Sequence, residues 1–134
     1  MFFFSDVSVI QINTKTGSRA WADTNDNIRM TICDASGSCC KTDVLDDKAR
    51  DDFKRGAVDD FMDPQVLGEC KTMEMKGPLT ATLDLEKTDG WYVKWAKIYL
   101  QEGRDFLCNF NTWLDNDSSD KSITNSKNVT CNQV

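Results

Sequence analysis

The stretch Trp91-Tyr-Val-Lys-Trp-Ala-Lys-Ile-Tyr-Leu100 is rich in aromatic and aliphatic residues, and it follows the turn signal Thr88-Asp89-Gly90. Apolar runs that are bounded by such turn signals are typical of β-strands. A second run, 80–85, lies just before this turn, and a third, 105–110, lies after it. This succession of runs and turns indicates antiparallel strands joined by short connections.

The N-terminal third of the chain shows the alternation of half-buried strands. Apolar or β-branched residues alternate with polar ones over 10–14 and again over 28–32. Together, about seven or eight short strands with turn signals about every 8 to 12 residues predict an all-β fold, an eight-stranded antiparallel β-sandwich.

The charged segment 43–60 is expected to be a long surface connection with at most one helical turn. The polar C-terminal segment is expected to be a loop that a disulfide fixes.

Length and composition indicate one folded domain. The chain has 134 residues, of which 40% are hydrophobic, and this is enough for a single core. We expect one domain over residues 1–134, with a core at about 8–115 and a polar tail at 116–134. Because the net charge is −6, the chain repels nucleic-acid phosphates, and nucleic acid is not an expected partner.

The cysteine pattern favours disulfides in an oxidising compartment. The chain has six cysteines but no histidine and no CxxC pair, so the usual zinc patterns are absent. Secretion is the expected localisation, and buried reduced thiols in a cytosolic protein are the alternative. About 15 pairings are possible. We expect adjacent Cys39 and Cys40 to have different partners and Cys131 to tie the tail to the body. The disulfide candidates are Cys33, Cys39, Cys40, Cys70, Cys108 and Cys131.

Two N-glycosylation motifs lie in the polar tail, Asn116-Asp-Ser118 and Asn128-Val-Thr130. Such acceptors are surface features of secreted proteins, so glycosylation at Asn116 and Asn128 is expected and supports secretion. No stretch of the chain is long and apolar enough to span a bilayer.

Five further segments match one family in order and in spacing. They are Thr16-Gly-Ser-Arg-Ala-Trp-Ala-Asp-Thr-Asn-Asp-Asn-Ile28, Asp51-Asp-Phe-Lys-Arg-Gly-Ala-Val-Asp-Asp-Phe61, Leu67-Gly-Glu69, Gly90-Trp-Tyr-Val-Lys-Trp95, and Phe106-Leu-Cys-Asn109 with Trp113-Leu114. They resemble PLAT/LH2 domains, the β-sandwich modules found at the N-terminus of animal lipoxygenases and the C-terminus of pancreatic lipase. The resemblance covers roughly residues 8–115. The expected core aromatics are Phe53, Phe61, Trp91 and Phe106.

The resemblance also implies a calcium site, since the equivalent loops of lipoxygenase domains bind calcium. Calcium accepts about six to eight oxygen ligands in irregular geometry, which separated acidic loops supply. Lys54 and Gly90 stand where related lipoxygenases carry acidic residues, so nearby carboxylates would have to substitute. The alternative is a solvated acidic surface in which Lys54 neutralises Asp51 or Asp52 without a metal. The predicted calcium ligands are Asp23, Asn25, Asp26, Asp51, Asp52 and Asp89.

Trp21 is the expected membrane or partner contact. It lies in mid-loop between small residues, with no strand periodicity that would bury it, and an exposed large aromatic marks an interaction site. By resemblance, tryptophans of the equivalent lipoxygenase loops enter the membrane. Trp95 and Trp113 are weaker candidates for the same role. The alternative for Trp21 is that it folds back over the end of the sandwich.

The residues argue against catalysis. Without histidine, Ser-His and Cys-His nucleophiles are excluded, and the chain has no Gly-x-Ser-x-Gly elbow or phosphate-binding glycine loop. We therefore expect a non-enzymatic secreted module that binds lipid membranes, assisted by calcium, through loops at one end of the sandwich. The alternatives are a protein-interaction module, such as a venom, defence or receptor-binding factor, and an acidic matrix protein that binds many weak calcium ions.

Overall fold

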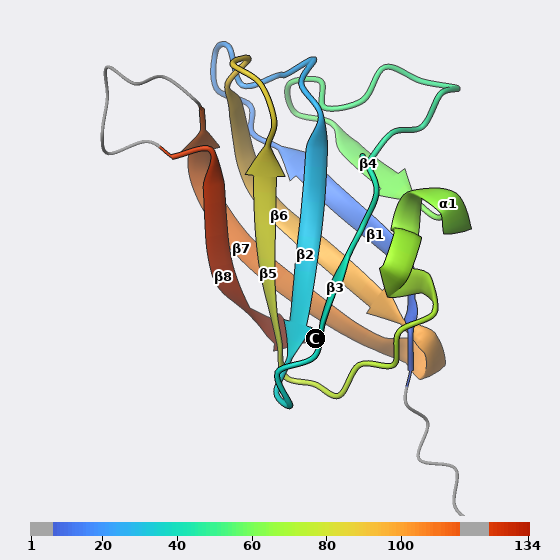
Figure 1. Cartoon of the computed structure of the whole chain (residues 1–134). Coiled ribbons are helices and arrows are strands. Elements are labelled where there is room, and N and C mark those ends of the chain that lie inside the picture. The colour runs from blue at the N-terminus through green and yellow to red at the C-terminus, as the bar shows by residue number, and fades with distance from the viewer. Residues whose placement is uncertain (1–6, 116–123) are drawn as a thin grey trace, which may run out of the picture.

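The computed structural model describes residues 7–115 and 124–134, which form eight strands and three short helical segments. The strands are β1 (Val9–Thr16), β2 (Ile28–Asp34), β3 (Cys39–Lys41), β4 (Val58–Phe61), β5 (Leu79–Leu85), β6 (Trp91–Leu100), β7 (Arg104–Leu114) and β8 (Ser126–Gln133) (Figure 1). The helix α1 (Pro64–Leu67) runs into a 3-10 turn (Gly68–Lys71), and a second 3-10 turn (Gln101–Gly103) links β6 to β7.

The strands form one curled sheet that folds over into two layers. Its order is β3-β2-β5-β8-β7-β6-β1-β4, and all neighbouring strands are antiparallel. The first four strands of this order make one layer and the last four make the other, and the β8–β7 pair joins them along one side (Figure 1). The predicted eight-stranded antiparallel β-sandwich is confirmed.

The core lies between the two layers and follows the alternation of the sequence. Ile28, Met30 and Ile32 are fully buried, and so are the inward-facing residues of β5 and β6. Ile10 departs from the pattern and is 39% exposed, because an irregularity in the β1–β6 pairing between Val9 and Gln11 changes which side chains face inward.

Residues 126–133 form a strand, which corrects the prediction of a loop in the C-terminal tail. β8 pairs with β5 along 126–130 and with β7 along 131–133. Cys131 is buried and Val129 packs on the core, while the other side chains of this strand are more exposed. With so few inward-facing apolar residues, the strand has no alternation by which the sequence could reveal it.

The helical turn lies after the charged segment rather than within it. Asp63 caps α1, because its Oδ1 accepts a hydrogen bond from the Gln65 N–H at 2.9 Å, and Pro64 occupies a first-turn position where its missing N–H costs nothing. The segment from 43 to 57 is irregular. Of the residues described, none belongs to a helix long and apolar enough to cross a membrane.

Three disulfides close the fold, Cys33–Cys39, Cys40–Cys70 and Cys108–Cys131. The adjacent cysteines therefore have different partners, as predicted, and Cys131 ties the C-terminal strand to β7. Cys40 and Cys70 are buried and link the edge strand β3 to the 3-10 turn after α1. Three disulfides in a small domain are typical of an extracellular protein.

Candidate functional site

Three loops meet at one end of the sandwich, and we call this region the loop end: residues 17–27, 42–57 and 86–90 (Figure 1, upper part). Backbone hydrogen bonds connect them. The Thr24 N–H donates to the Phe53 carbonyl at 3.2 Å, and the Glu86 N–H donates to the Asn27 carbonyl at 3.1 Å. The first loop also rests on β6, since the Tyr92 N–H donates to the Ala22 carbonyl at 3.0 Å. The three loops thus form one connected surface.

Trp21 projects from this surface. Its side chain is 85% exposed, and its backbone has a φ of +66°, a conformation that non-glycine residues rarely adopt. Ala22 beside it is fully buried, so the chain is held at the base of the projection. The alternative that Trp21 folds back over the sandwich is excluded. Contact of Trp21 with a membrane or a partner stays a prediction.

Trp95 and Trp113, the weaker candidates, are half-buried rather than projecting. Trp113 packs edge-on against Tyr92, with 5.3 Å between the ring centroids, and Trp95 lies within β6 opposite Asn109 of β7. The Arg19 guanidinium lies over the same Tyr92 ring at 4.5 Å. These aromatics form part of the outer sheet surface below the loop end.

Buried aromatics support the loops from beneath. Trp91 is fully buried and donates its Nε1–H to the Thr16 hydroxyl at 2.8 Å. Phe53 packs against Trp91 at 5.0 Å and against Phe61 at 5.8 Å between ring centroids. These three residues and Phe106 are 0 to 4% exposed, so the predicted core aromatics are confirmed.

Asp26, a predicted calcium ligand, is a buried structural carboxylate. Its Oδ1 accepts the N–H groups of Asn27 and Lys87 at 2.7 and 2.8 Å, and its Oδ2 accepts those of Lys87 and Asp89 at 2.9 and 3.3 Å. Asp89 in turn accepts the Asn25 N–H on Oδ2 at 2.6 Å. Hydrogen bonds therefore connect the first loop to the third.

Arg50 is the centre of a charge cluster that sequence analysis did not single out. Its Nε lies 2.7 Å from Oδ1 of Asp52 and 3.2 Å from Oδ1 of Asp59, and its Nη1 lies 2.7 Å from Oδ1 of Asp60 and 3.3 Å from Oδ2 of Asp47. Although partial burial opposes it, hydrogen bonds to Asp52 and Asp60 raise the pKa of Arg50. The sequence offered one signal for this cluster, the position of Arg50 within an acid-rich segment.

Asp52 is one of two nearly buried carboxylates in this cluster. Its side chain is 6% exposed, and its Oδ2 accepts the Asp47 N–H at 2.8 Å. Burial raises the pKa of the Asp52 carboxyl above its ordinary value of 3.8, although the Asp47 N–H and Arg50 act in the opposite direction. The nearby Asp46 carboxyl adds to the increase. Asp52 is thus a nearly buried carboxylate whose ion-pair partner is Arg50.

A shallow pocket of about 210 Å³ brings four of the six predicted ligands together, Asn25, Asp26, Asp51 and Asp52. Asp23 and Asp89 do not line it. Lys54 pairs with Asp51 at 3.0 Å between Nζ and Oδ2, which is the metal-free arrangement considered above as the alternative.

These residues do not fit a calcium ion as they are arranged. The oxygens of Asp26 and Asp52 already accept hydrogen bonds from the protein, and Arg50 places a fixed positive charge in the wall of the pocket. Within residues 7–115 and 124–134, no three carboxylate, thiol or imidazole groups are close enough to hold a metal together. Hydrogen bonds and ion pairs of the protein itself occupy the carboxylates of Asp26, Asp51, Asp52 and Asp89.

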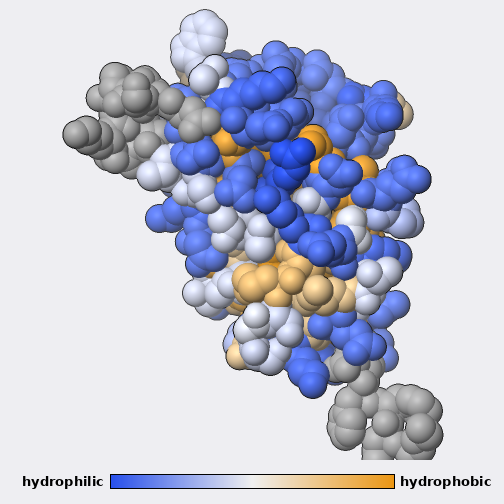
Figure 2. All heavy atoms as spheres, in the orientation of Figure 1, coloured by the Kyte–Doolittle hydropathy of each residue, from blue (hydrophilic) through white to orange (hydrophobic). Residues whose placement is uncertain are grey.

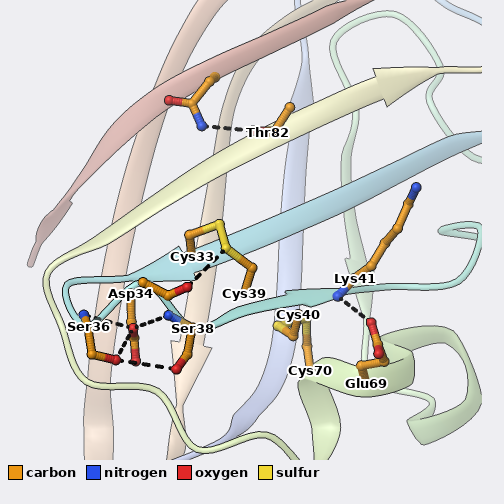
Figure 3. Close-up of a disulfide and its surroundings, with 12 residues drawn as sticks. Cys33, Asp34, Ser36, Ser38, Cys39, Cys40, Lys41, Glu69, Cys70 and Thr82 are labelled. Carbon is orange, nitrogen blue, oxygen red and sulfur yellow. Dashed lines mark hydrogen bonds between the residues drawn. A yellow bond between two sulfur atoms is a disulfide. The ribbon is translucent and has the colours of Figure 1, made fainter.

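A second feature, the hairpin between β2 and β3, lies at the other end of the sandwich. Asp34 organises it: Oδ1 accepts the Ser36 and Ser38 N–H groups, each at 3.0 Å (Figure 3). Its Oδ2 accepts the Lys76 N–H at 2.9 Å. Although burial opposes it, these hydrogen bonds lower the pKa of Asp34 below 3.8. The Cys33–Cys39 disulfide closes the base of the hairpin (Figure 3).

Asp34→Ala should destabilise the fold by about 2 kcal/mol at neutral pH, since it leaves several N–H groups without their charged acceptor. Because the folded pKa is lowered, this stabilisation is present above pH 3.8 and is lost as the pH falls through the folded pKa. Urea unfolding of both proteins at about pH 6 and about pH 3 measures it, with Asp84→Asn on β5 as the control. A difference between Asp34→Ala and wild type that does not shrink in acid would contradict the assignment.

The glycosylation predictions fall on two different parts of the chain. Asn128 is exposed on β8, and its Nδ2 donates to the Thr82 hydroxyl at 2.8 Å across the outer face of the sheet. Asn116 lies outside the described residues. Modification of either residue stays a prediction.

No protein-family sequence model and no curated protein matches the chain. Solved structures match it in shape. A coral 8R-lipoxygenase matches with a TM-score of 0.64 and 17% identity over 92% of this chain and 17% of its own. Alpha-toxin from Clostridium absonum matches with a TM-score of 0.63 and 20% identity, over 94% and 32%. Alpha-toxin from Clostridium perfringens matches with a TM-score of 0.61 and 16% identity, over 92% and 31%.

The chain spans less than a third of the toxins' length and about a sixth of the lipoxygenase's. At these identities the likeness is one of fold, and it extends over nearly all of the chain, as the sequence resemblance implied. The chain therefore has the PLAT/LH2 fold, the β-sandwich that these lipoxygenases and alpha-toxins contain.

Proposed function

We propose that the chain is a non-enzymatic, secreted module that docks onto lipid membranes through the loop end. The observation that carries this proposal is the 85% exposed indole of Trp21, which projects from a base of connected loops. Burial of an aromatic side chain in the membrane interface is favourable, and a tryptophan ring suits that boundary because it has an apolar body and one polar N–H.

The rest of the loop end is polar. Hydrophilic residues cover most of the upper half of the face shown in Figure 2, with only small apolar areas between them. The net charge of −6 also gives no general attraction to anionic lipid. Docking therefore depends on insertion of Trp21 rather than on a broad apolar patch or on overall charge.

The fold likeness is consistent with this proposal without proving it. The coral 8R-lipoxygenase is described as activated by calcium through a C2-like domain. In the present chain the corresponding acidic loops do not fit calcium, so the proposal assigns no step to the metal.

Trp21→Ala should reduce binding to vesicles by about tenfold or more. Removal of only about 60 Å² of buried apolar area costs about 1.5 kcal/mol, which is slightly more than a factor of ten in affinity. Sedimentation with vesicles of phosphatidylcholine alone and with added phosphatidylserine measures it, each with calcium and with chelator. Met62→Ala is the matched control, since Met62 is also exposed, at 55%, but lies beside α1.

Binding by wild type and Met62→Ala, with loss in Trp21→Ala, supports docking through this loop. Absence of wild-type binding to every vesicle would reject the proposal and favour the alternative, a protein partner that contacts the same end of the sandwich. Binding that the Trp21→Ala variant retains in full would move the membrane contact elsewhere.

A further inference from the structure

We propose that Arg50 is the built-in cation of the loop end, so that the acidic second loop is held against β4 by a guanidinium and not by calcium. The inference concerns what holds the proposed docking surface in place. It rests on the proposed function only in the vesicle-binding measurement at the end. It predicts that calcium has no effect on the natural chain and that loss of Arg50 destabilises the chain whether or not calcium is present.

The contacts of Arg50 come from two segments, the second loop and β4. Its guanidinium reaches the carboxylates of Asp47 and Asp52 in the second loop and of Asp59 and Asp60 in β4, all within 3.3 Å. Its Nη2 also donates to the Asp60 carbonyl at 2.6 Å. A planar guanidinium with five N–H donors suits this divergent set of oxygens, whereas a lysine would supply one point charge.

Two of these carboxylates are nearly buried. The side chains of Asp52 and Asp59 are 6% and 4% exposed. Buried anions need a partner of opposite charge, because desolvation of an isolated carboxylate is costly. Among the residues that the structure describes, Arg50 is the cation recorded in ion pairs with both of them.

A chain of contacts leads from Arg50 to the Trp21 loop. Asp59 Oδ2 accepts the Phe53 N–H at 2.8 Å, and the Phe53 carbonyl accepts the Thr24 N–H at 3.2 Å. The guanidinium also lies over the Phe61 ring at 5.2 Å, and that ring packs on Phe53. Arg50 thus holds in place the backbone against which the projecting loop rests.

The same charges explain why calcium is not needed. Asp52 is the one predicted calcium ligand that is recorded in an ion pair with Arg50, and a guanidinium that is part of the chain cannot dissociate from the protein. If the guanidinium is removed, four carboxylates remain without their common cation. Nearly buried carboxylates that lack a cation are costly, so loss of Arg50 should destabilise the fold.

The test compares wild type with Arg50→Gln by thermal unfolding, with 5 mM calcium chloride and with chelator at matched ionic strength. We expect the wild-type Tm to differ by less than about 1 °C between the two conditions. We expect Arg50→Gln to lower the Tm by about 10 °C, both in chelator and in calcium. Lys54→Gln is the matched control, because Lys54 forms one exposed pair with Asp51 and its loss should change the Tm little.

A wild-type Tm that rises by several degrees with calcium, or an Arg50→Gln variant as stable as wild type, would overturn the proposal. If Arg50→Gln does not fold, calorimetric titration of wild type with calcium decides instead: saturable binding below about 1 mM overturns the proposal, and no binding supports it. Vesicle binding of wild type in chelator completes the test, and its failure alone would count against membrane docking and not against the role of Arg50.

Discussion

Trp91→Ala is expected to lower the free energy of unfolding by about 4 kcal/mol, near the upper end for a core substitution. The indole is fully buried between the layers, so its loss removes a large apolar contact and leaves a cavity. Its Nε1–H also satisfies the buried Thr16 hydroxyl, which would lose its partner. Urea unfolding followed by circular dichroism measures the change.

Trp91→Phe separates the two contributions of this side chain. Phenylalanine keeps most of the packing against Phe53 but lacks the donor for Thr16, so the expected loss is about 1 to 2 kcal/mol. Equal losses for the two variants would show that the hydrogen bond, and not the packing, makes the larger contribution. Any loss of vesicle binding by the two Trp91 variants should follow their loss of folding stability, since Trp91 lies beneath the loop end and not on its surface.

The second large effect is expected for removal of the Cys40–Cys70 disulfide. Replacement of both residues with alanine should cost about 4 kcal/mol, because a cross-link between residues 30 apart in sequence restricts the unfolded chain strongly. Both sulfurs are buried, which adds a packing loss. The measurement is the urea midpoint of the double variant compared with that of wild type.

The Cys33–Cys39 disulfide provides a matched control within the same chain. It joins residues only six apart in sequence, and Cys39 is exposed. Replacement of both cysteines with serine should therefore cost less than removal of Cys40–Cys70. The entropy of loop closure alone makes the difference between the two costs about 1.4 kcal/mol. A larger effect for this pair than for Cys40–Cys70 would contradict the chain-entropy explanation for this protein.

The fold was predictable from the sequence because most strands carry a strong alternation or a bounded apolar run. The bounds of β6 were read from the quoted stretch itself. β8 was missed because Cys131 and Val129 are its main contacts with the core, and the strand is defined mainly by backbone pairing with β5 and β7. Ile10 was placed inside because sequence periodicity does not reveal an irregularity in pairing.

The candidate site was predictable in position but not in chemistry. The sequence indicated which loops meet, and it indicated that Trp21 would be exposed, since nothing around it offered a buried face. It did not show that Asp26 and Asp52 are satisfied by N–H groups and by Arg50, because those partners come from backbone geometry and from residues that looked like ordinary mixed charge. Only the folded arrangement distinguishes an acidic loop with its own cation from one that needs a metal.

The unequal lengths of the strands have a consequence for self-association. The curled sheet ends in β3 and β4, which have three and four residues, and the Cys40–Cys70 bond anchors β3 beside α1. Long unpaired strand edges act as templates on which other chains add strands. Here both edge strands are short, and one of them, β3, is held by the Cys40–Cys70 disulfide. We therefore expect these two edges to be poor templates for strand addition and for growth into fibrils.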